Sequence, residues 1–333
     1  MNFPARALPF PHSPMSQGSR TVLIAALAAN LLIALTKFGA AAFTHSSAML
    51  SEAVHSLVDT SNEVLLMYGT RAAARPADEE HPLGHGREFY FWSFIVSLLI
   101  FAVGAGVSTY EGIRHVMDPV EMDNPLVNYV VLGLAFVFES VSWVFAFREF
   151  RTRKGSRGYL EAATQTKDPT ALIVFLEDSA ALIGIVIAFA GTWAAQALQD
   201  PVYDGVASIA IGLLLAAVAV FLARENKKLL IGEAARPALE RGIGRIAREE
   251  HAVQALNGML TFQVSPNQVI AALSLHFRDG LDSDSIEMAV ERLEARIREQ
   301  HPEILMLLVK PQNPAAYQRA VEARKRWHEL DAT

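Results

Sequence analysis

The chain has 333 residues, of which 52% are hydrophobic and 19% are charged. Soluble proteins carry about 25% charged residues, and the apolar excess here is gathered in segments, which indicates membrane spans and not a larger core. The absence of cysteine excludes disulfides, thiolate zinc sites and cysteine nucleophiles, and a net charge of −6 gives no reason to expect nucleic acid as a partner.

Taken in chain order, residues 1–20 are rich in proline and lack a long apolar run, which predicts a disordered tail. Residues 21–225 are then predicted to form a transmembrane domain with six spans. The first span is almost wholly apolar, and Lys37 near its far end is expected to snorkel to the membrane interface. The six predicted spans are Thr21–Phe43, Ala48–Tyr68, Phe89–Tyr110, Val127–Phe147, Thr170–Leu198 and Tyr203–Leu222.

Arginine and lysine gather in the loops on one side of this topology. These are the loop from Arg71 to Arg87, the loop from Arg148 to Arg157, and the exit that begins at Arg224. By the positive-inside rule this side is cytoplasmic, so both termini are expected in the cytoplasm. Since residues 1–20 do not read as a transit peptide, the expected location is a bacterial inner membrane.

Beyond Gly232 the composition changes to that of a small soluble domain. Its pattern predicts a helix, two strands joined by a Ser-Pro-Asn turn, a second helix and a third strand, in the order αββαβ. The predicted fold is therefore an all-α six-helix transmembrane bundle followed by a small α+β, ferredoxin-like domain at residues 226–312. So small a sheet gains stability by pairing with a copy of itself, so we expect a homodimer. Residues 313–333 are expected to form a helical or frayed tail.

The second span is too polar for an ordinary membrane helix. His55 and Asp59 are four residues apart and share one helical face, with Ser51, Ser56 and Asn62 on or beside it. A charged side chain inside a bilayer costs at least about 2.5 kcal/mol, so this face indicates a functional site on an ion path. The alternative is a partly exposed amphipathic helix with a solvated polar face.

Four segments of the chain form a characteristic set. They are HSSAMLSEAVHSLVD (45–59), ADEEHPLGHGREF (77–89), LEDSAALIG (176–184) and PVYDGVASIAIG (201–212). Together with the short αββαβ domain they resemble the cation diffusion facilitators, a family of metal-exporting antiporters. The resemblance runs from about residue 22 to residue 309, and LEDSAALIG is most similar to the branch that includes the mitochondrial zinc transporter nine.

The resemblance implies a transport site with two metal ligands from the second span and two from the fifth. The second-span pair falls on His55 and Asp59, and the His-x-x-x-Asp spacing is associated with zinc in the family. On the fifth span Asp178 matches one ligand, but Val174 stands where the other is expected. Glu177 is the nearest substitute, although adjacent residues on a helix point about 100° apart.

The fourth ligand stays open, because Asn62, Glu139 and water are further candidates. The alternative for Glu177 and Asp178 is a structural role, either within their helix or in an ion pair with Lys167.

A second candidate site lies in the basic loop after the second span. Asp78, His81 and His85 are close in sequence, and Gly84 and Gly86 permit tight bends between and beside them. The resemblance implies a cytoplasmic metal site at these three residues. The alternative is a polar loop whose histidines bond to the backbone.

Together these features predict a divalent metal efflux transporter in the lipid bilayer, with zinc and protons as substrates and no resident cofactor. Imidazole and carboxylate are zinc ligands, and metal binding displaces their protons. We therefore expect proton-coupled antiport by alternating access, with His55 as the coupling residue because histidine titrates near physiological pH. The alternatives are a membrane-anchored metal sensor and a passive cation channel. Enzyme motifs for zinc hydrolysis, acyl transfer and phosphate binding are missing from the sequence, so no enzyme is expected.

Overall fold

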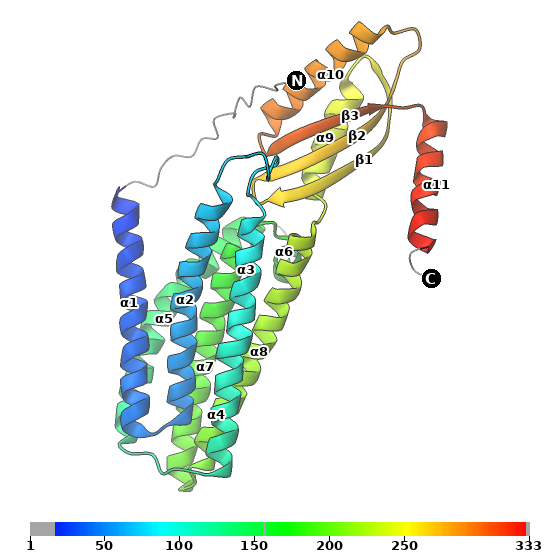
Figure 1. Ribbon diagram of the computed structural model, residues 1–333. Coiled ribbons are helices and arrows are strands. Elements are labelled where there is room, and N and C mark those ends of the chain that lie inside the picture. Colours follow the sequence, from blue (N-terminus) through cyan, green and yellow to red (C-terminus); the bar gives the residue numbers. More distant parts are fainter. Residues whose placement is uncertain (1–16, 156–157, 331–333) are drawn as a thin grey trace. The chain divides into compact units, whose positions relative to one another are not determined.

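The computed structural model describes residues 17–155 and 158–330 (Figure 1). The chain divides into two compact units that meet between Leu230 and Ile231. Most of the tail predicted for residues 1–20 lies outside the described residues, and the first helix begins at Gln17. The division between the units falls five residues after the predicted one at residue 225, because the last helix of the first unit continues to Ile231.

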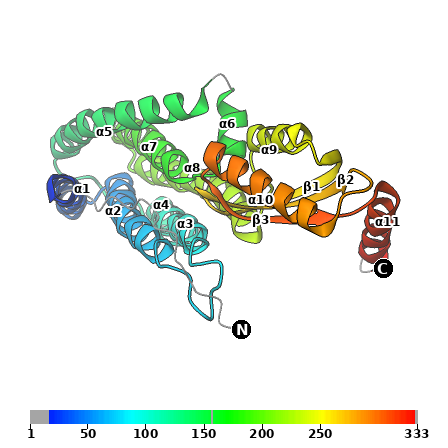
Figure 2. The same ribbon diagram turned by 90° about the horizontal axis from the view of Figure 1, so that it is seen from above.

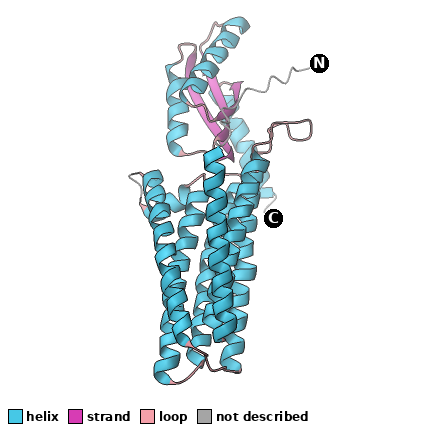
Figure 3. Cartoon of the chain, turned by 90° about the vertical axis from the view of Figure 1, so that its left-hand side faces the viewer, coloured by secondary structure: helices cyan, strands magenta, loops and turns pink. Residues whose placement is uncertain are grey.

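Long helices form the described part of the first unit, and their connections are short at one end of the bundle (Figures 1 and 3). The third of them is continuous from Glu88 to Met117, with a π-helical stretch η1 in its middle. The helices are α1 (Gln17–Thr44), α2 (Ser47–Ala73), α3 (Glu88–Leu99), η1 (Ile100–Ala105), α4 (Gly106–Met117), α5 (Pro125–Lys154), the short α6 (Tyr159–Gln165), α7 (Thr170–Leu198) and α8 (Val202–Ile231).

Four helices in the described residues are long and apolar enough to cross a membrane. This confirms a helical, membrane-spanning class, while the count of six spans stays a prediction. Helix α2 is not apolar enough to count among them, because its interior carries polar side chains. Helix α1 is not among them because its described apolar part is the shorter stretch Asn30–Thr44. The four helices are Glu88–Met117, Pro125–Thr152, Thr170–Leu198 and Val202–Ile231.

Helix α2 is central to the first unit. Seen end on in Figure 2, it lies between α1 and the continuous helix of α3 and α4, and α5 lies beside α7. Helices α4 and α8 approach each other closely, since a Cβ atom at Gly112 would lie 2.8 Å from the carbonyl oxygen of Gly205. Glycine at this position therefore allows direct contact between the two backbones.

A buried carboxylate on α8 fixes the start of α2. Asp204 is 1% exposed and accepts hydrogen bonds from the Ser46 hydroxyl (2.7 Å) and from the backbone N–H groups of Ser47 (2.6 Å) and Ala48 (3.2 Å). The first N–H groups of a helix lack partners within the helix, and a negative charge there is favourable. Asp204 thus caps α2 from a neighbouring helix and sets where its polar face begins.

The second unit is an α+β domain, as the sequence predicts. A three-stranded sheet has the order β1-β2-β3, with β1 and β2 antiparallel and β2 and β3 parallel. Its core joins Ile243 of helix α9 and Leu293 of helix α10 with Leu273 of the central strand β2. The elements are α9 (Pro237–Glu249), β1 (Val253–Ser265), β2 (Gln268–Phe277), α10 (Ser283–Gln300), β3 (Ile304–Pro311) and α11 (Pro314–Leu330).

We expect Asp204→Ala to lower the free energy of unfolding by about 2 kcal/mol, because three donors at the start of α2 lose a charged acceptor. Denaturant titration of the detergent-solubilised chain, followed by circular dichroism, measures this. The matched control is Asp200→Ala, which removes the exposed side chain that accepts from the N–H of Val202 (3.0 Å). An equal effect of the two substitutions would contradict the role given to Asp204.

Candidate functional site

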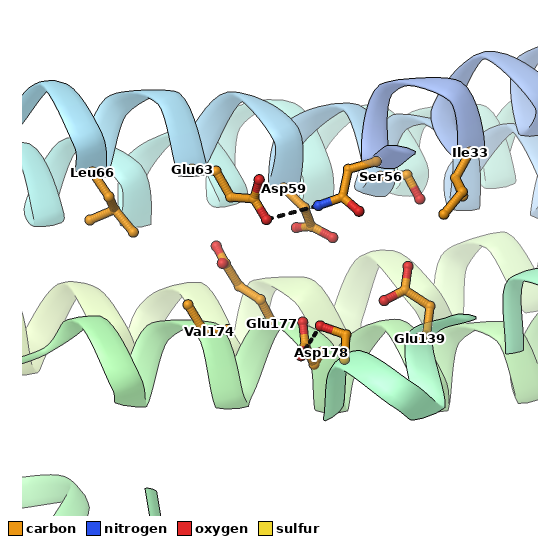
Figure 4. A pocket seen from close by; sticks show the side chains of 11 residues that line it. Ile33, Ser56, Asp59, Glu63, Leu66, Glu139, Val174, Glu177 and Asp178 are labelled. Atoms are coloured by element: carbon orange, nitrogen blue, oxygen red, sulfur yellow. Dashed lines mark hydrogen bonds between the residues drawn. The ribbon is translucent and has the colours of Figure 1, made fainter. Parts of the chain in front are cut away.

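A cavity of about 60 Å³ lies inside the first unit and is lined from α1, α2, α5 and α7 (Figure 4). Since one water molecule needs about 10–15 Å³ of such space, the cavity has room for an ion and a few waters. Five carboxyl side chains line it, two from α2, one from α5 and two from α7. The lining residues are Asn30, Ile33, Ser56, Asp59, Glu63, Leu66, Glu139, Ser142, Val174, Glu177 and Asp178.

Amide and hydroxyl groups hold three of these acids in place. The bonds run from Asn62 Nδ2 to Glu177 Oε1 (2.6 Å), from Asn30 Nδ2 to Glu63 Oε1 (2.8 Å) and from Ser142 Oγ to Asp178 Oδ2 (2.8 Å). Among the described residues, Asp59 Oδ1, Glu63 Oε2 and Asn62 Oδ1 are buried acceptors without a hydrogen-bond partner. Unpaired buried acceptors are costly, and a bound cation would satisfy them.

His55 lies next to this cavity but does not line it in the described structure. The side chain is 2% exposed, and Nδ1 is 3.3 Å from Asp59 Oδ1, one helical turn away. The two atoms are near enough for an ion pair but are not aligned for a hydrogen bond, and neither ring nitrogen has such a partner among the described residues. Because His55 is buried, the alternative of a solvated face does not hold at this position.

The structure therefore brings Asp59, Glu177 and Asp178 to one cavity, with His55 behind Asp59. Figure 4 shows Glu177 pointing across the cavity toward α2, so two adjacent acids on α7 reach the same space. Val174 also lines the cavity, and a ligand at this position would face the same space. Glu177 accepts a hydrogen bond from Asn62, and Asp178 accepts one from Ser142.

Three polar lining residues were missed in the sequence, namely Glu63, Asn30 and Ser142. Glu63 follows Asp59 by four residues, so it continues the face of His55 and Asp59 by one further turn, and this spacing is the signal that predicts it. Asn30 has no comparable signal, because a single amide in an apolar span does not show which acid it will meet.

The expectation that Lys37 snorkels to the interface is wrong. The side chain is fully buried, and its Nζ donates to Glu52 Oε2 (3.1 Å) and to Ser56 Oγ (2.8 Å). The adjacent helix α2 supplies a carboxylate and a hydroxyl within reach, so the ammonium group finds its partners inside the bundle.

The loop residues Asp78, His81 and His85 form a second cluster outside the helices. One ligand atom from each lies within 4.8 Å of the others. The His85 Nδ1 donates to the carbonyl oxygen of Pro76 (3.2 Å), and its Nε2 lies 3.5 Å from Asp78 Oδ2. A histidine of the loop thus bonds to the backbone, as expected for a purely structural loop. The same loop also has a geometry that can hold a metal ion.

The turn around Asp78 keeps its carboxylate ionised. The backbone N–H of His81 donates to Asp78 Oδ1 (2.6 Å), and this bond holds the pKa of Asp78 below its usual range. Because the folded pKa is lowered, the contribution of this bond is present above the ordinary pKa of an aspartate and is lost as the pH falls through the lowered value. At neutral pH Asp78 is therefore ready to bind a cation without first losing a proton.

These features define a helical membrane protein whose bundle encloses an acidic cavity of the size of a hydrated ion. The family model described as the cation efflux transmembrane domain matches residues 23–231. The chain therefore belongs to the cation efflux family, which confirms the resemblance to the cation diffusion facilitators. That description is one of transport and not of enzyme activity.

Three similar proteins illustrate the breadth of the family. The chain is 30% identical over 285 residues to the mitochondrial proton-coupled zinc antiporter SLC30A9 of Xenopus laevis, covering 83% of this chain and 51% of that protein. It is 33% identical over 220 residues to metal tolerance protein C4 of Arabidopsis thaliana, covering 66% and 48%. It is 26% identical over 286 residues to the cation-efflux pump FieF of Cronobacter sakazakii, covering 85% and 89%.

The chain spans about half the length of the first two relatives. Similarity to SLC30A9 confirms the resemblance to the branch that includes zinc transporter nine.

We expect Val174→Asp to tighten zinc binding by about tenfold, because it adds a carboxylate of nearly the same shape to a cavity that five carboxyl groups already line. Isothermal titration of the detergent-solubilised chain with zinc measures this. The isosteric control Val174→Asn adds no charge and should change the affinity by less than about threefold. Weaker or unchanged binding by Val174→Asp would show that position 174 does not face the bound ion.

The loop cluster is tested separately in a chain whose central site carries Asp59→Asn and Asp178→Asn. In that background we expect Asp78→Asn to weaken the remaining zinc binding by about tenfold or more, since the only carboxylate of the cluster is lost. Glu80→Gln is the control, because Glu80 is an exposed acid of the same loop outside the cluster. Equal zinc binding by both variants would show that the loop does not bind zinc through Asp78.

Proposed function

We propose that the chain exports a divalent metal cation, zinc in the first place, in exchange for protons. The observation that carries this proposal is the cavity, in which five carboxyl groups meet between helices of a membrane-spanning bundle. Names among the relatives support it, since SLC30A9 is called a proton-coupled zinc antiporter and FieF a cation-efflux pump.

The proposed transport site consists of Asp59, Asp178, His55 and Glu177. Zinc takes about four ligands among imidazole nitrogen and carboxylate oxygen. The His55 ring has no hydrogen bond to hold it in the described structure, so it is free to turn toward an ion beside Asp59. Glu177 takes the place of the ligand absent at Val174, and its bond from Asn62 fixes its direction.

Proton exchange follows from the crowding of the acids. Five carboxylates in a cavity of about 60 Å³ cannot all stay ionised without a compensating positive charge. When zinc leaves, protons take its place on the carboxyl groups and on His55, and when zinc enters they are expelled. The loop cluster at Asp78, His81 and His85 would be the second, cytoplasmic metal site.

Alternating access is proposed as a movement between two groups of helices. Helices α1, α2, α5 and α7 surround the cavity, while α4 and α8 are held together by direct backbone contact at Gly112 and Gly205. Asp204 of α8 remains bonded to the start of α2 and would act as the pivot between the groups.

The remaining features of the topology belong to the same proposal. Helices α1 and α2 would cross the membrane with the four apolar helices, giving six spans with both termini in the cytoplasm. The basic loops support this orientation. The α+β domain would join two copies of the chain, and a bacterial inner membrane is the proposed location.

We expect purified chain in proteoliposomes to move zinc when a pH gradient is imposed. Asp59→Asn should reduce the initial rate by about a hundredfold, because a carboxylate ligand is lost from a site with few of them. Glu121→Gln, an exposed acid outside the cavity, is the control and should keep the wild-type rate. A zinc-sensitive dye inside the vesicles gives the rate.

Each rival function has its own outcome in this assay. A membrane-anchored sensor gives no zinc flux with or without the gradient. A passive channel gives a flux that is indifferent to the gradient. Either result from the wild-type chain would overturn antiport.

A further inference from the structure

The ion pair between Lys37 of α1 and Glu52 of α2 is the most deeply buried ion pair among the described residues of the first unit. Both side chains are 0% exposed, with Nζ and Oε2 3.1 Å apart. Glu52 Oε1 has no hydrogen-bond partner in the described part of the chain. It lies against Gly184 of α7, where an added Cβ atom would overlap it. The pair therefore fills the space between three helices that surround the transport cavity.

The pair stands between two cavities. The second cavity, of about 410 Å³, is lined by the far end of α1, the start of α2 and the end of α4. On α1, Ile33 lines the acidic cavity and Ala41 lines the second one, and Lys37 is four residues, about 6 Å, from each. On α2, Ser56 lines the acidic cavity and Leu50 the second, and Glu52 lies between them.

Lys37 also touches the wall of the acidic cavity, because its Nζ donates to Ser56 Oγ (2.8 Å). A cation that left the acidic cavity for the second one along α1 and α2 would have to pass this ammonium group. A fixed positive charge on a narrow route through a membrane protein is an effective barrier to cations.

A buried ion pair is weak evidence for a stabilising role. Removing two charges from water costs several kcal/mol for each ion, and neutral side chains of the same volume are often as stable or more so. A role in transport is therefore the better explanation of its position.

We propose that Lys37, held by Glu52 and Ser56, closes the route between the acidic cavity and the second cavity, so that zinc does not leak through the bundle. This inference rests on the proposed function, because Lys37 can prevent a zinc leak only if the chain transports zinc. In this role Lys37 makes the passage of zinc depend on a conformational change. Outward release of zinc then requires that the Lys37 ammonium group leave the Ser56 side of the cavity.

The test is a neutral replacement of the pair, Lys37→Met with Glu52→Gln, which keeps both shapes and leaves no unpaired charge. The matched control is Lys228→Met with Glu225→Gln, which removes an ion pair (2.6 Å) near the end of α8, away from both cavities. Proteoliposomes are loaded with zinc, and its release is followed without a pH gradient. Zinc affinity is measured alongside by titration.

The double variant should release zinc about tenfold faster than the wild type or more, while its zinc affinity changes by less than about threefold. Addition of Asp59→Asn should abolish the leak, since the ion passes through the acidic cavity. Should the double variant not fold, Ser56→Ala frees Lys37 from the cavity wall with both charges kept, and should raise the leak about threefold.

If the wild type transports zinc under the pH gradient but the variants leak no faster than the wild type, only the role of Lys37 is overturned and the proposed function stands. A leak that persists after Asp59→Asn also overturns the role of Lys37, because the leaking zinc then does not pass through the acidic cavity. A wild type without gradient-driven zinc transport overturns the proposed function, and this inference with it.

Discussion

Negative charge crowded into a small space inside apolar helices is the constraint on which the rest of the first unit depends. Burying even one unpaired carboxylate is costly, and five line a single cavity of about 60 Å³. The surroundings reduce this cost only in part, through the amides of Asn30 and Asn62 and the hydroxyl of Ser142. In the proposed function the remaining compensation comes from metal ions and protons that take turns in the cavity.

The fold positions this charge through contacts outside the cavity. Asp204 sets the start of α2, and from there the polar face of α2 runs past Glu52 to Asp59 and Glu63. Glycine contacts bring the backbones of α4 and α8 together, and in the proposed mechanism these two helices move as a group against the helices around the cavity. Lys37 supplies a positive charge of the protein's own at one wall of the cavity, through its bond to Ser56.

Much of this architecture could be predicted from the sequence, because it depends on local pattern. The polar face of α2 and the αββαβ order of the second unit follow from spacing and composition. The acids of α7 follow from the resemblance to the family. The hydrogen-bond and ion-pair partners of the buried polar side chains could not be predicted, because they depend on which helices become neighbours. Lys37 was expected at the interface because it lies near the end of an apolar span, and nothing in the sequence pairs it with Glu52 fifteen residues away. The amides that hold the acids likewise carried no signal of their targets.

The central claim is that the acids of α2 and α7 hold one transported ion between them. The most direct measurement is a structure of the zinc-loaded chain with the metal located by anomalous scattering at the zinc absorption edge. The account predicts an ion in the acidic cavity within about 2.0–2.2 Å of carboxylate oxygens from both Asp59 and Asp178. Zinc found only at the loop of Asp78, His81 and His85, with the cavity empty under saturating metal, would contradict it.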